Sequence, residues 1–197
     1  VEITDATTNG ASIPNNANYG AAVENIGDLD SDGVNDMAVG EMHEYPNLSP
    51  YQGMVNIHLM NGDGSIKSTT EINGTTLPND KITSSYIHWG SAITNIGDQD
   101  GDGVNDIAVG APYEGYFANT DGVGGNDGEH TKGGVYVLNM ENDGTVKASY
   151  RINEDTTNGP TLKATSVGWA DGPHFGSSIT STDINGDGKS DLVIGGE

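Results

Sequence analysis

Three short segments of the chain contain alternating acidic residues of the kind that a hard metal ion requires. Each follows the pattern Asp-x-Asp/Asn-x-Asp-Gly-x-x-Asp, at residues 28–36, 98–106 and 183–191. Ca²⁺ takes roughly six to eight oxygen ligands, and alternate short carboxylates on a curled loop converge on one point. We therefore predict three Ca²⁺ sites. The expected side-chain ligands, from positions 1, 3, 5 and 9, are Asp28, Asp30, Asp32 and Asp36, then Asp98, Asp100, Asp102 and Asp106, then Asp183, Asn185, Asp187 and Asp191.

Two other positions of the motif define the kind of loop. The glycine at position 6 permits a sharp turn, and position 7 is expected to offer its backbone carbonyl as a ligand. The position 7 residues are Val34, Val104 and Lys189. In an EF-hand, position 12 is a bidentate Glu on the exiting helix. Position 12 here is Val39, Val109 or Ile194, which excludes an EF-hand.

The residues that follow each loop predict strands. An apolar, β-branched run meets a glycine within a few residues, so each loop joins the first and second strands of a hairpin. Third strands are predicted at residues 53–59 and 134–138. Asp- and Gly-rich turns at 61–64 and 142–144 then lead into fourth strands near 70–72 and 149–152. Each full repeat is thus predicted to be a four-stranded antiparallel meander.

The repeat also predicts the organisation of the whole chain. We expect an all-β partial propeller of two full blades with flanking strands. Its parts are an outer strand of a preceding blade at 1–10, a blade at 17–76, a blade at 85–157 with an insertion at 113–132, and the first half of a third blade at 168–197. A closed propeller needs about 4–8 blades. We therefore expect the chain to be an excised piece of a longer polypeptide or to be completed by other copies.

An aromatic-Gly pair opens each copy, and the second copy continues after its loop as Val109-Gly110-Ala111-Pro112. The three pairs are Tyr19-Gly20, Trp89-Gly90 and Phe175-Gly176. With the Asp loops, these residues resemble the FG-GAP repeat of integrin α-subunit propellers and of related bacterial surface proteins. The resemblance implies a seven-bladed propeller with Ca²⁺ on one face and ligand-binding loops on the other. The first and third copies depart from the Gly-Ala-Pro turn, with Gly40-Glu41-Met42 and Gly195-Gly196-Glu197.

Composition limits the partners and the location. The formal charge of −22 disfavours nucleic acid and anionic membrane surfaces and favours cations. The chain has no Cys, which excludes disulfides and thiolate sites, and no apolar run long enough to insert into a membrane. Loops of extracellular modules bind Ca²⁺ at about 10⁻⁴–10⁻³ M. We expect an extracellular or cell-surface protein from a bacterium or archaeon.

Three functions remain open from the sequence. The first is a calcium-stabilised adhesion or surface-interaction module that binds a protein or glycan. The second is a structural subunit whose blade edges join neighbouring copies into a filament or sheath. The third is an accessory propeller of a secreted hydrolase.

We predict no enzyme activity in these residues, because no Ser/His/Asp arrangement or Gly-rich phosphate loop is present. The aromatic residues Tyr19, Trp89 and Phe175 are interpreted as core residues because they recur where each blade begins. In the insertion, Tyr116, Phe117 and His130 are the residues with most potential for binding.

Overall fold

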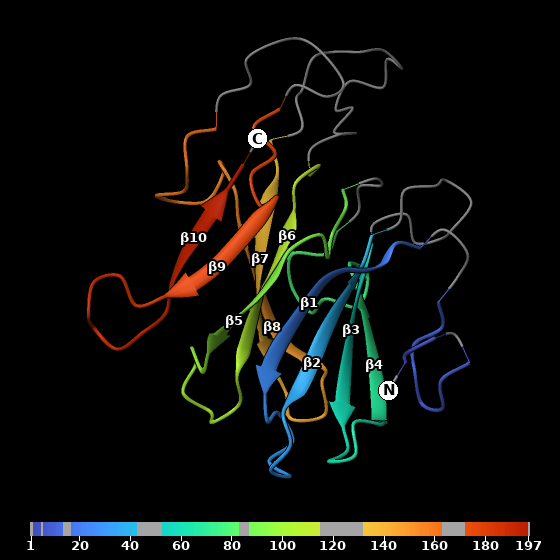
Figure 1. Cartoon of the computed structure of the whole chain (residues 1–197). Coiled ribbons are helices and arrows are strands. Elements are labelled where there is room, and N and C mark those ends of the chain that lie inside the picture. The colour runs from blue at the N-terminus through green and yellow to red at the C-terminus, as the bar shows by residue number, and fades with distance from the viewer. Residues whose placement is uncertain are drawn as a thin grey trace.

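The computed structural model is all-β, as predicted (Figure 1). It describes residues 2–4, 6–13, 17–42, 53–82, 87–114, 132–162 and 172–196. Among these residues ten strands are assigned and no helix. Accordingly, the described part of the chain holds no helix with the length and apolar character needed to cross a bilayer.

Two complete four-stranded antiparallel sheets confirm the predicted meanders. The first sheet has the order β1-β2-β3-β4 and the second β5-β6-β7-β8, while β9 and β10 form a two-stranded hairpin. The bounds of the first sheet are β1 Tyr19–Gly27, β2 Asp36–Glu41, β3 Met54–Met60 and β4 Ile66–Asn73. Those of the second are β5 Ile93–Gly97, β6 Asp106–Ala111, β7 Gly134–Met140 and β8 Val146–Ile152. The hairpin comprises β9 Ser178–Thr182 and β10 Asp191–Gly195.

The turns between third and fourth strands have identical chemistry in the two sheets. Asn61 N donates to Ser65 O at 2.8 Å, and Asp63 Oδ1 accepts from Ser65 N at 2.9 Å. The second sheet repeats the first bond between Glu141 and Thr145 at 2.8 Å. Gly64 and its counterpart in the second sheet have φ of 82° and 81°, a conformation that favours glycine. Both turns lie at the same end of the molecule as the Asp loops (Figure 1).

The sheets stack face to face, with their first strands β1, β5 and β9 side by side. The main core lies between the first two sheets and includes Ile57, Trp89, Ile107 and Tyr136. Trp89 is fully buried and meets the Tyr136 ring edge-on, with ring centroids 6.4 Å apart. This confirms the interpretation of Trp89 as a core residue. A second cluster, which includes Val135, Phe175 and Leu192, joins the second sheet to the third hairpin.

The aromatic-Gly pairs hold successive sheets together at their backbones. Trp89 forms an isolated parallel bridge with Gly53 of the preceding sheet, and Phe175 forms the same bridge with Gly133. A Cβ atom added at Gly53 would lie 2.0 Å from the Trp89 carbonyl oxygen, so only glycine permits this approach. The opening pairs of the second and third repeats therefore contact the repeat before them.

The segments that follow the fourth strands repeat as well, and the outer strand expected at residues 1–10 stays a prediction. Residues 2–4 and 6–10 have no strand assignment, and Thr7 N donates to Thr4 O at 3.0 Å in a turn that matches the one at Asn153–Thr156. An outer strand needs the third strand of its own blade as partner, and the described residues supply none for this segment. The segment instead lies along β4, where Thr69 Oγ1 donates to Asn9 O at 2.6 Å.

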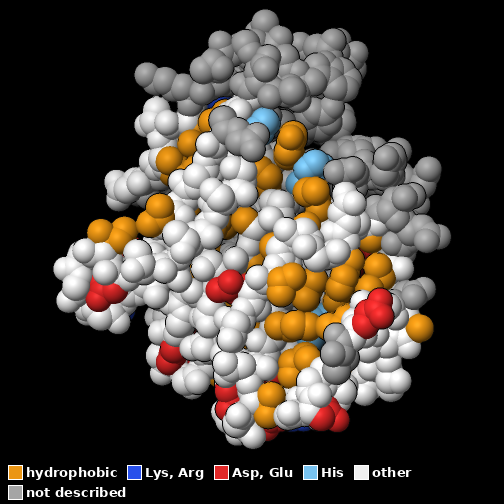
Figure 2. Space-filling view, in the orientation of Figure 1, with side chains coloured by type: hydrophobic (Ala, Val, Ile, Leu, Met, Phe, Trp, Pro, Cys, Tyr) orange, Lys and Arg blue, Asp and Glu red, His pale blue; other side chains and the backbone are white. Residues whose placement is uncertain are grey.

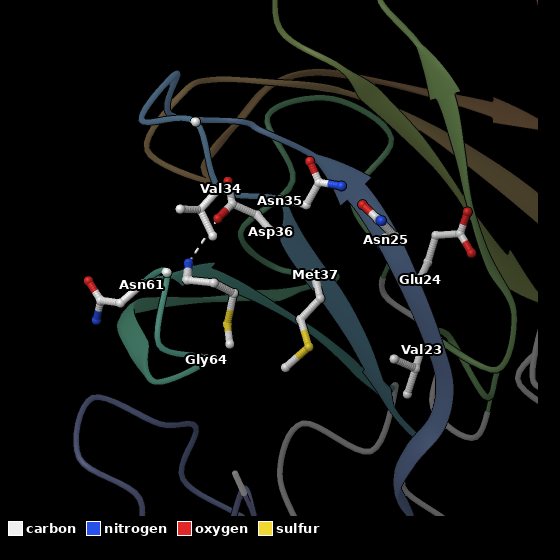
Figure 3. Close-up of a pocket in the computed structure, with 12 residues that line it drawn as sticks. Val23, Glu24, Asn25, Val34, Asn35, Asp36, Met37, Asn61 and Gly64 are labelled. Atoms are coloured by element: carbon white, nitrogen blue, oxygen red, sulfur yellow. Dashed lines mark hydrogen bonds between the residues drawn. The ribbon is translucent and has the colours of Figure 1, made fainter.

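The first sheet exposes an apolar face whose counterpart in the second sheet is covered. Val23 is 63% exposed, whereas the matching Ile93 is 7% exposed and packs toward the first sheet. Hydrophobic side chains gather over the first sheet in the space-filling view (Figure 2). Figure 3 shows the pocket there, lined by residues that include Val23, Val34 and Met37. This pocket is therefore the position that a further sheet would fill in the same stacking.

A row of hydrogen-bonded polar side chains replaces part of the apolar core in the first sheet. His58 is fully buried; its Nε2 lies 2.5 Å from Tyr19 Oη and its Nδ1 lies 2.7 Å from Thr69 Oγ1. Burial lowers the pKa of His58 to about 4. Burial and, to a smaller extent, the nearby Glu41 carboxylate raise the pKa of Tyr19 to about 12. Both groups are therefore neutral at pH 7.

Acidification is expected to destabilise the protein through His58 by about 3 kcal/mol. The pKa of His58 is lower in the folded protein, about 4, than its ordinary value of 6.5. The unfolded chain consequently binds the extra proton first, and stability falls as the pH drops from 6.5 to about 4. Urea unfolding of the wild type and His58→Leu at pH 7 and pH 4 measures this difference. Leu is the matched replacement because Leu138 stands at the same register position in the second sheet. Equal losses in the two proteins would contradict the prediction.

Candidate metal centres

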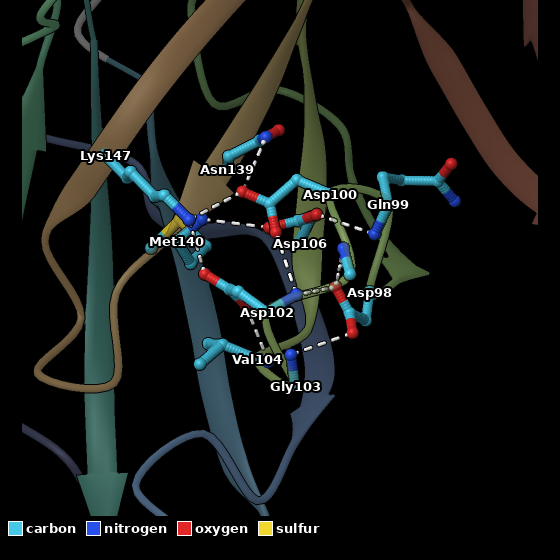
Figure 4. Close-up of polar contacts among 11 residues, drawn as sticks. Asp98, Gln99, Asp100, Asp102, Gly103, Val104, Asp106, Asn139, Met140 and Lys147 are labelled. Atoms are coloured by element: carbon cyan, nitrogen blue, oxygen red, sulfur yellow. Dashed lines mark hydrogen bonds and ion pairs between the residues drawn. The ribbon is translucent and has the colours of Figure 1, made fainter.

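The first carboxylate of each Asp loop shapes the loop through backbone amides. In the second loop, Asp98 Oδ1 accepts from Gly101 N at 2.7 Å and from Asp102 N at 3.1 Å, while its Oδ2 accepts from Gly103 N at 2.8 Å (Figure 4). The first loop has the corresponding bonds from Asp32 N and Gly33 N to Asp28, at 2.9 Å each. The glycine at position 6 has φ near 90° in these loops, 89° in the first and 91° in the second. The backbone thus folds around the carboxylate at position 1.

The last carboxylate ties each of the first two loops to the third strand of its sheet. Asp106 is fully buried; its Oδ2 accepts from Gln99 N at 2.8 Å and its Oδ1 from Met140 N at 2.9 Å. Asp36 makes the same two bonds in the first sheet, with Leu29 N and Met60 N at 2.8 Å each. Burial raises the pKa of Asp36 and Asp106, and the backbone hydrogen bonds oppose that rise.

The structure brings carboxylates of positions 1, 3 and 9 together in two of the three loops. In each group, one oxygen of each carboxylate lies within 4.8 Å of the others. The groups are Asp28, Asp30 and Asp36, and Asp98, Asp100 and Asp106. Carboxylates held this close repel one another until a cation neutralises them. The donors are all hard oxygens, and this chemistry fits Ca²⁺ better than a metal that prefers nitrogen or sulfur.

A lysine from the fourth strand contacts each of these two loops. Lys67 Nζ lies 2.5 Å from Asp30 Oδ2 and 2.8 Å from Asp32 Oδ2. Lys147 Nζ lies 2.8 Å from Asp100 Oδ2 and 2.7 Å from Asp102 Oδ2 (Figure 4). Hydrogen bonds with the lysines lower the pKa of Asp32 and Asp102. The two ammonium groups show that the outward-facing oxygens of these loops accept a positive charge.

The loop lysines were missed in the sequence, although a local signal was present. The turns read Asp63-Gly64-Ser65-Ile66-Lys67 and Asp143-Gly144-Thr145-Val146-Lys147, with the lysine at the same place in each. Asn139 was also missed; its Nδ2 donates to Asp100 Oδ2 at 3.1 Å. Asn105 Nδ2, at position 8 of the second loop, donates to Ile26 O of the first sheet at 3.0 Å, so this loop also helps to join the sheets.

The third loop keeps the backbone pattern of the other two. Asp183 Oδ1 accepts from Gly186 N at 2.7 Å, and Asp183 Oδ2 accepts from Gly188 N at 2.9 Å. Asp191 Oδ2 accepts from Ile184 N at 3.0 Å. Position 3 is the amide Asn185, whose Oδ1 accepts from Asp187 N at 2.8 Å. The three loops are therefore built alike, although the third has one fewer carboxylate.

The remaining predicted ligands are placed as follows. The position 5 residues Asp32 and Asp102 lie outside the close carboxylate groups, and each accepts from the position 7 amide at 2.9 Å. Asp187 accepts in the same way from Lys189 N at 2.8 Å. The carbonyl ligands expected from Val34, Val104 and Lys189 stay predictions.

At the opposite end of the molecule, three rings are in contact near the start of the insertion; Tyr113 stacks on His174 and is tilted against His88. Tyr113 lies between His88 and His174, with ring centroids 4.4 Å and 4.5 Å away. Glu114, the last described residue before the gap, accepts from Tyr136 Oη at 3.0 Å and pairs with Arg151 at 3.0 Å. Tyr116, Phe117 and His130 lie outside the described residues.

Comparison with known proteins agrees with this repeat architecture. The FG-GAP repeat model matches residues 175–196, which comprise the third aromatic-Gly pair, its Asp loop and β10. Integrin alpha-V of Gallus gallus is 34% identical over 111 residues, 56% of this chain and 9% of the relative. Integrin alpha-5 of Xenopus laevis is 27% identical over 174 residues, 85% of this chain and 14% of the relative.

Integrin alpha-8 of Gallus gallus is also similar, with 31% identity over 103 residues, 50% of this chain and 9% of the relative. The chain thus spans a small fraction of the length of these relatives. In sequence and in its repeated four-stranded sheets, the chain is therefore similar to FG-GAP repeat proteins and to integrin α subunits.

Proposed function

We propose that this chain is a calcium-binding extracellular adhesion-type module whose Asp loops bind Ca²⁺ and thereby stabilise the blade hairpins. The main support is the recurrence of one oxygen-rich loop at equivalent strand connections, with two close carboxylate groups. Bound Ca²⁺ supplies positive charge and oxygen coordination, which hold the loop in its curled form. Similarity to integrin α subunits supports the adhesion role.

The residues of each loop would have different roles in binding the ion. The carboxylates at positions 1, 3 and 9 would hold the ion, and Asp36 or Asp106 would connect it to the third strand through the amide of Met60 or Met140. A metal at this place would therefore fix three strands of one blade at once. In the third loop we propose Asp183, Asn185, Asp187 and Asp191 as the side-chain ligands.

We further propose that the partner is a protein or glycan and that it binds at the end opposite the Asp loops. That end carries the contacting rings of His88, Tyr113 and His174 and the start of the 113–132 insertion. The proposed location is extracellular or at the cell surface, where millimolar Ca²⁺ would fill the sites. A bacterial or archaeal source stays a prediction from the absence of Cys.

A separate observation supports completion by a further blade that packs on a sheet face, which differs from the edge-to-edge joining expected of a filament or sheath subunit. The exposed face of the first sheet, with Val23 63% exposed, matches the face by which the second sheet packs on the first. We propose that a further blade of the same kind covers this face. Analytical ultracentrifugation of the chain tests whether a second copy does so, since a copy on this face gives a concentration-dependent mass.

The proposed metal function is tested by calorimetric titration of the chain with Ca²⁺. The expected result is three bound ions with dissociation constants of about 10⁻⁴–10⁻³ M. Asp98→Asn combined with Asp100→Asn should remove one ion and leave the others, since each loop draws its ligands from its own blade. No heat of binding in millimolar Ca²⁺, or a stoichiometry unchanged by these substitutions, would contradict the proposal.

A further inference from the structure

The ammonium groups of Lys67 and Lys147 use the loop oxygens that are free of backbone hydrogen bonds. In the first loop, Oδ1 of Asp30 and Oδ1 of Asp32 accept from backbone amides at 3.3 Å and 2.9 Å. Lys67 takes Oδ2 of both residues. In the second loop, Lys147 likewise takes Oδ2 of Asp100 and Asp102, while both Oδ1 atoms accept backbone amides.

A metal ion that binds these carboxylates must compete for the same oxygens. The Oδ1 atoms at positions 3 and 5 already accept backbone amides, which fix the orientation of each carboxylate. The Oδ2 atoms face the lysine, so a cation that uses them must displace the ammonium group. One site cannot hold an ammonium group and a Ca²⁺ ion in contact with the same oxygens, since their charges repel.

We propose that the ammonium groups of Lys67 and Lys147 occupy the place of a metal ion at the first two Asp loops. They keep these loops folded when no metal is bound, and they move away when Ca²⁺ binds. This inference rests on the proposed calcium function. It predicts two classes of site. The first two loops are preformed and bind the ion more weakly than their carboxylates alone would allow, because each ion first displaces a lysine.

The third loop supplies a natural comparison. Among the described residues, no ion pair reaches Asp183, Asp187 or Asp191. Lys189 lies within this loop, but the bond it makes there is from its backbone N to Asp187. In the part of the chain that the structure describes, no lysine side chain neutralises the third loop, and we expect its shape to depend more strongly on bound metal.

The test compares Lys67→Met and Lys147→Met with Lys81→Met. All three substitutions remove one positive charge and keep a long apolar side chain. Lys81 is exposed and enters no ion pair among the described residues, so it controls for the general attraction of Ca²⁺ to a more acidic protein. Calcium affinity is measured by calorimetry at fixed ionic strength, and the Tm is measured in EDTA.

Each loop variant is expected to bind Ca²⁺ at its own site about three- to tenfold more tightly than Lys81→Met, the range for two exposed ion pairs. In EDTA, the Tm of the loop variants should fall below that of Lys81→Met, because the carboxylates then lack a counter-charge. Affinity equal to or weaker than that of Lys81→Met would overturn the inference while leaving the calcium function intact. Absence of calcium binding by the wild type would instead overturn the function itself, and a Tm in EDTA equal to the control's would show that the lysines do not hold the apo loops.

Discussion

Removal of calcium with EDTA is expected to lower the Tm by roughly 10–20 °C relative to about 5 mM Ca²⁺. Three sites with dissociation constants of about 10⁻⁴–10⁻³ M would together stabilise the folded state by about 3–7 kcal/mol at this concentration. The physical cause is that the unfolded chain lacks the curled loops and does not gather the carboxylates. Differential scanning calorimetry in EDTA and in a Ca²⁺ series measures the shift.

Magnesium is the control for general screening of the −22 charge. Mg²⁺ demands a near-octahedral geometry and gives up water reluctantly, so the same concentration should restore little of the lost Tm. If Mg²⁺ and Ca²⁺ raised the Tm equally, the effect would come from charge screening and not from ordered sites. A Tm that does not respond to either ion would contradict the stabilising role altogether.

Asp106→Ala is expected to destabilise the protein by about 3–5 kcal/mol even in EDTA. The carboxylate of Asp106 accepts two backbone amides, Gln99 N at 2.8 Å and Met140 N at 2.9 Å, and is fully buried. Truncation leaves both donors without their partner in the protein. Urea unfolding without calcium measures the change directly.

Two variants separate this structural role from metal binding. Asp191→Ala should cost roughly half as much, since Asp191 accepts from one described amide, Ile184 N at 3.0 Å. Asp102→Asn keeps an acceptor for Val104 N. Its loss of unfolding free energy should therefore be measured mainly in Ca²⁺ and be small in EDTA. An Asp106→Ala variant as stable in EDTA as the wild type would show that the buried carboxylate serves the metal alone.

The Asp loops combine a structural role with the proposed metal-binding role. The same carboxylate that would hold the ion at position 9 also anchors the loop to the third strand. In the second loop, Asn105 adds a bond to Ile26 O of the first sheet, so the loop also contributes to the stacking of sheets. A metal bound at the second loop would therefore be coupled to its own blade and to the contact of that blade with the first sheet.

Local sequence determined the strands, the hairpins and the position of each Asp loop. β-branched runs, positive-φ glycines and alternate aspartates act over a few residues, and the matching turns at 61–65 and 141–145 confirm that this chemistry suffices. The repeat also predicted Trp89 as a core residue. The outer strand expected at residues 1–10 stays a prediction, because the described residues include no third strand that could pair with it.

Tertiary structure alone decided which distant residues meet at the loops. Lys67 reaches Asp30 across 37 residues, and Met140 reaches Asp106 across 34. Such contacts depend on the register of β3, β4, β7 and β8 and on the stacking of the sheets. A short sequence motif predicts neither of these. The same stacking covers Ile93 and exposes Val23, although the two residues hold equivalent places in the repeat. The sequence therefore specified the acidic loops, whereas the fold decided which cation-bearing side chain and which neighbouring sheet each loop would face.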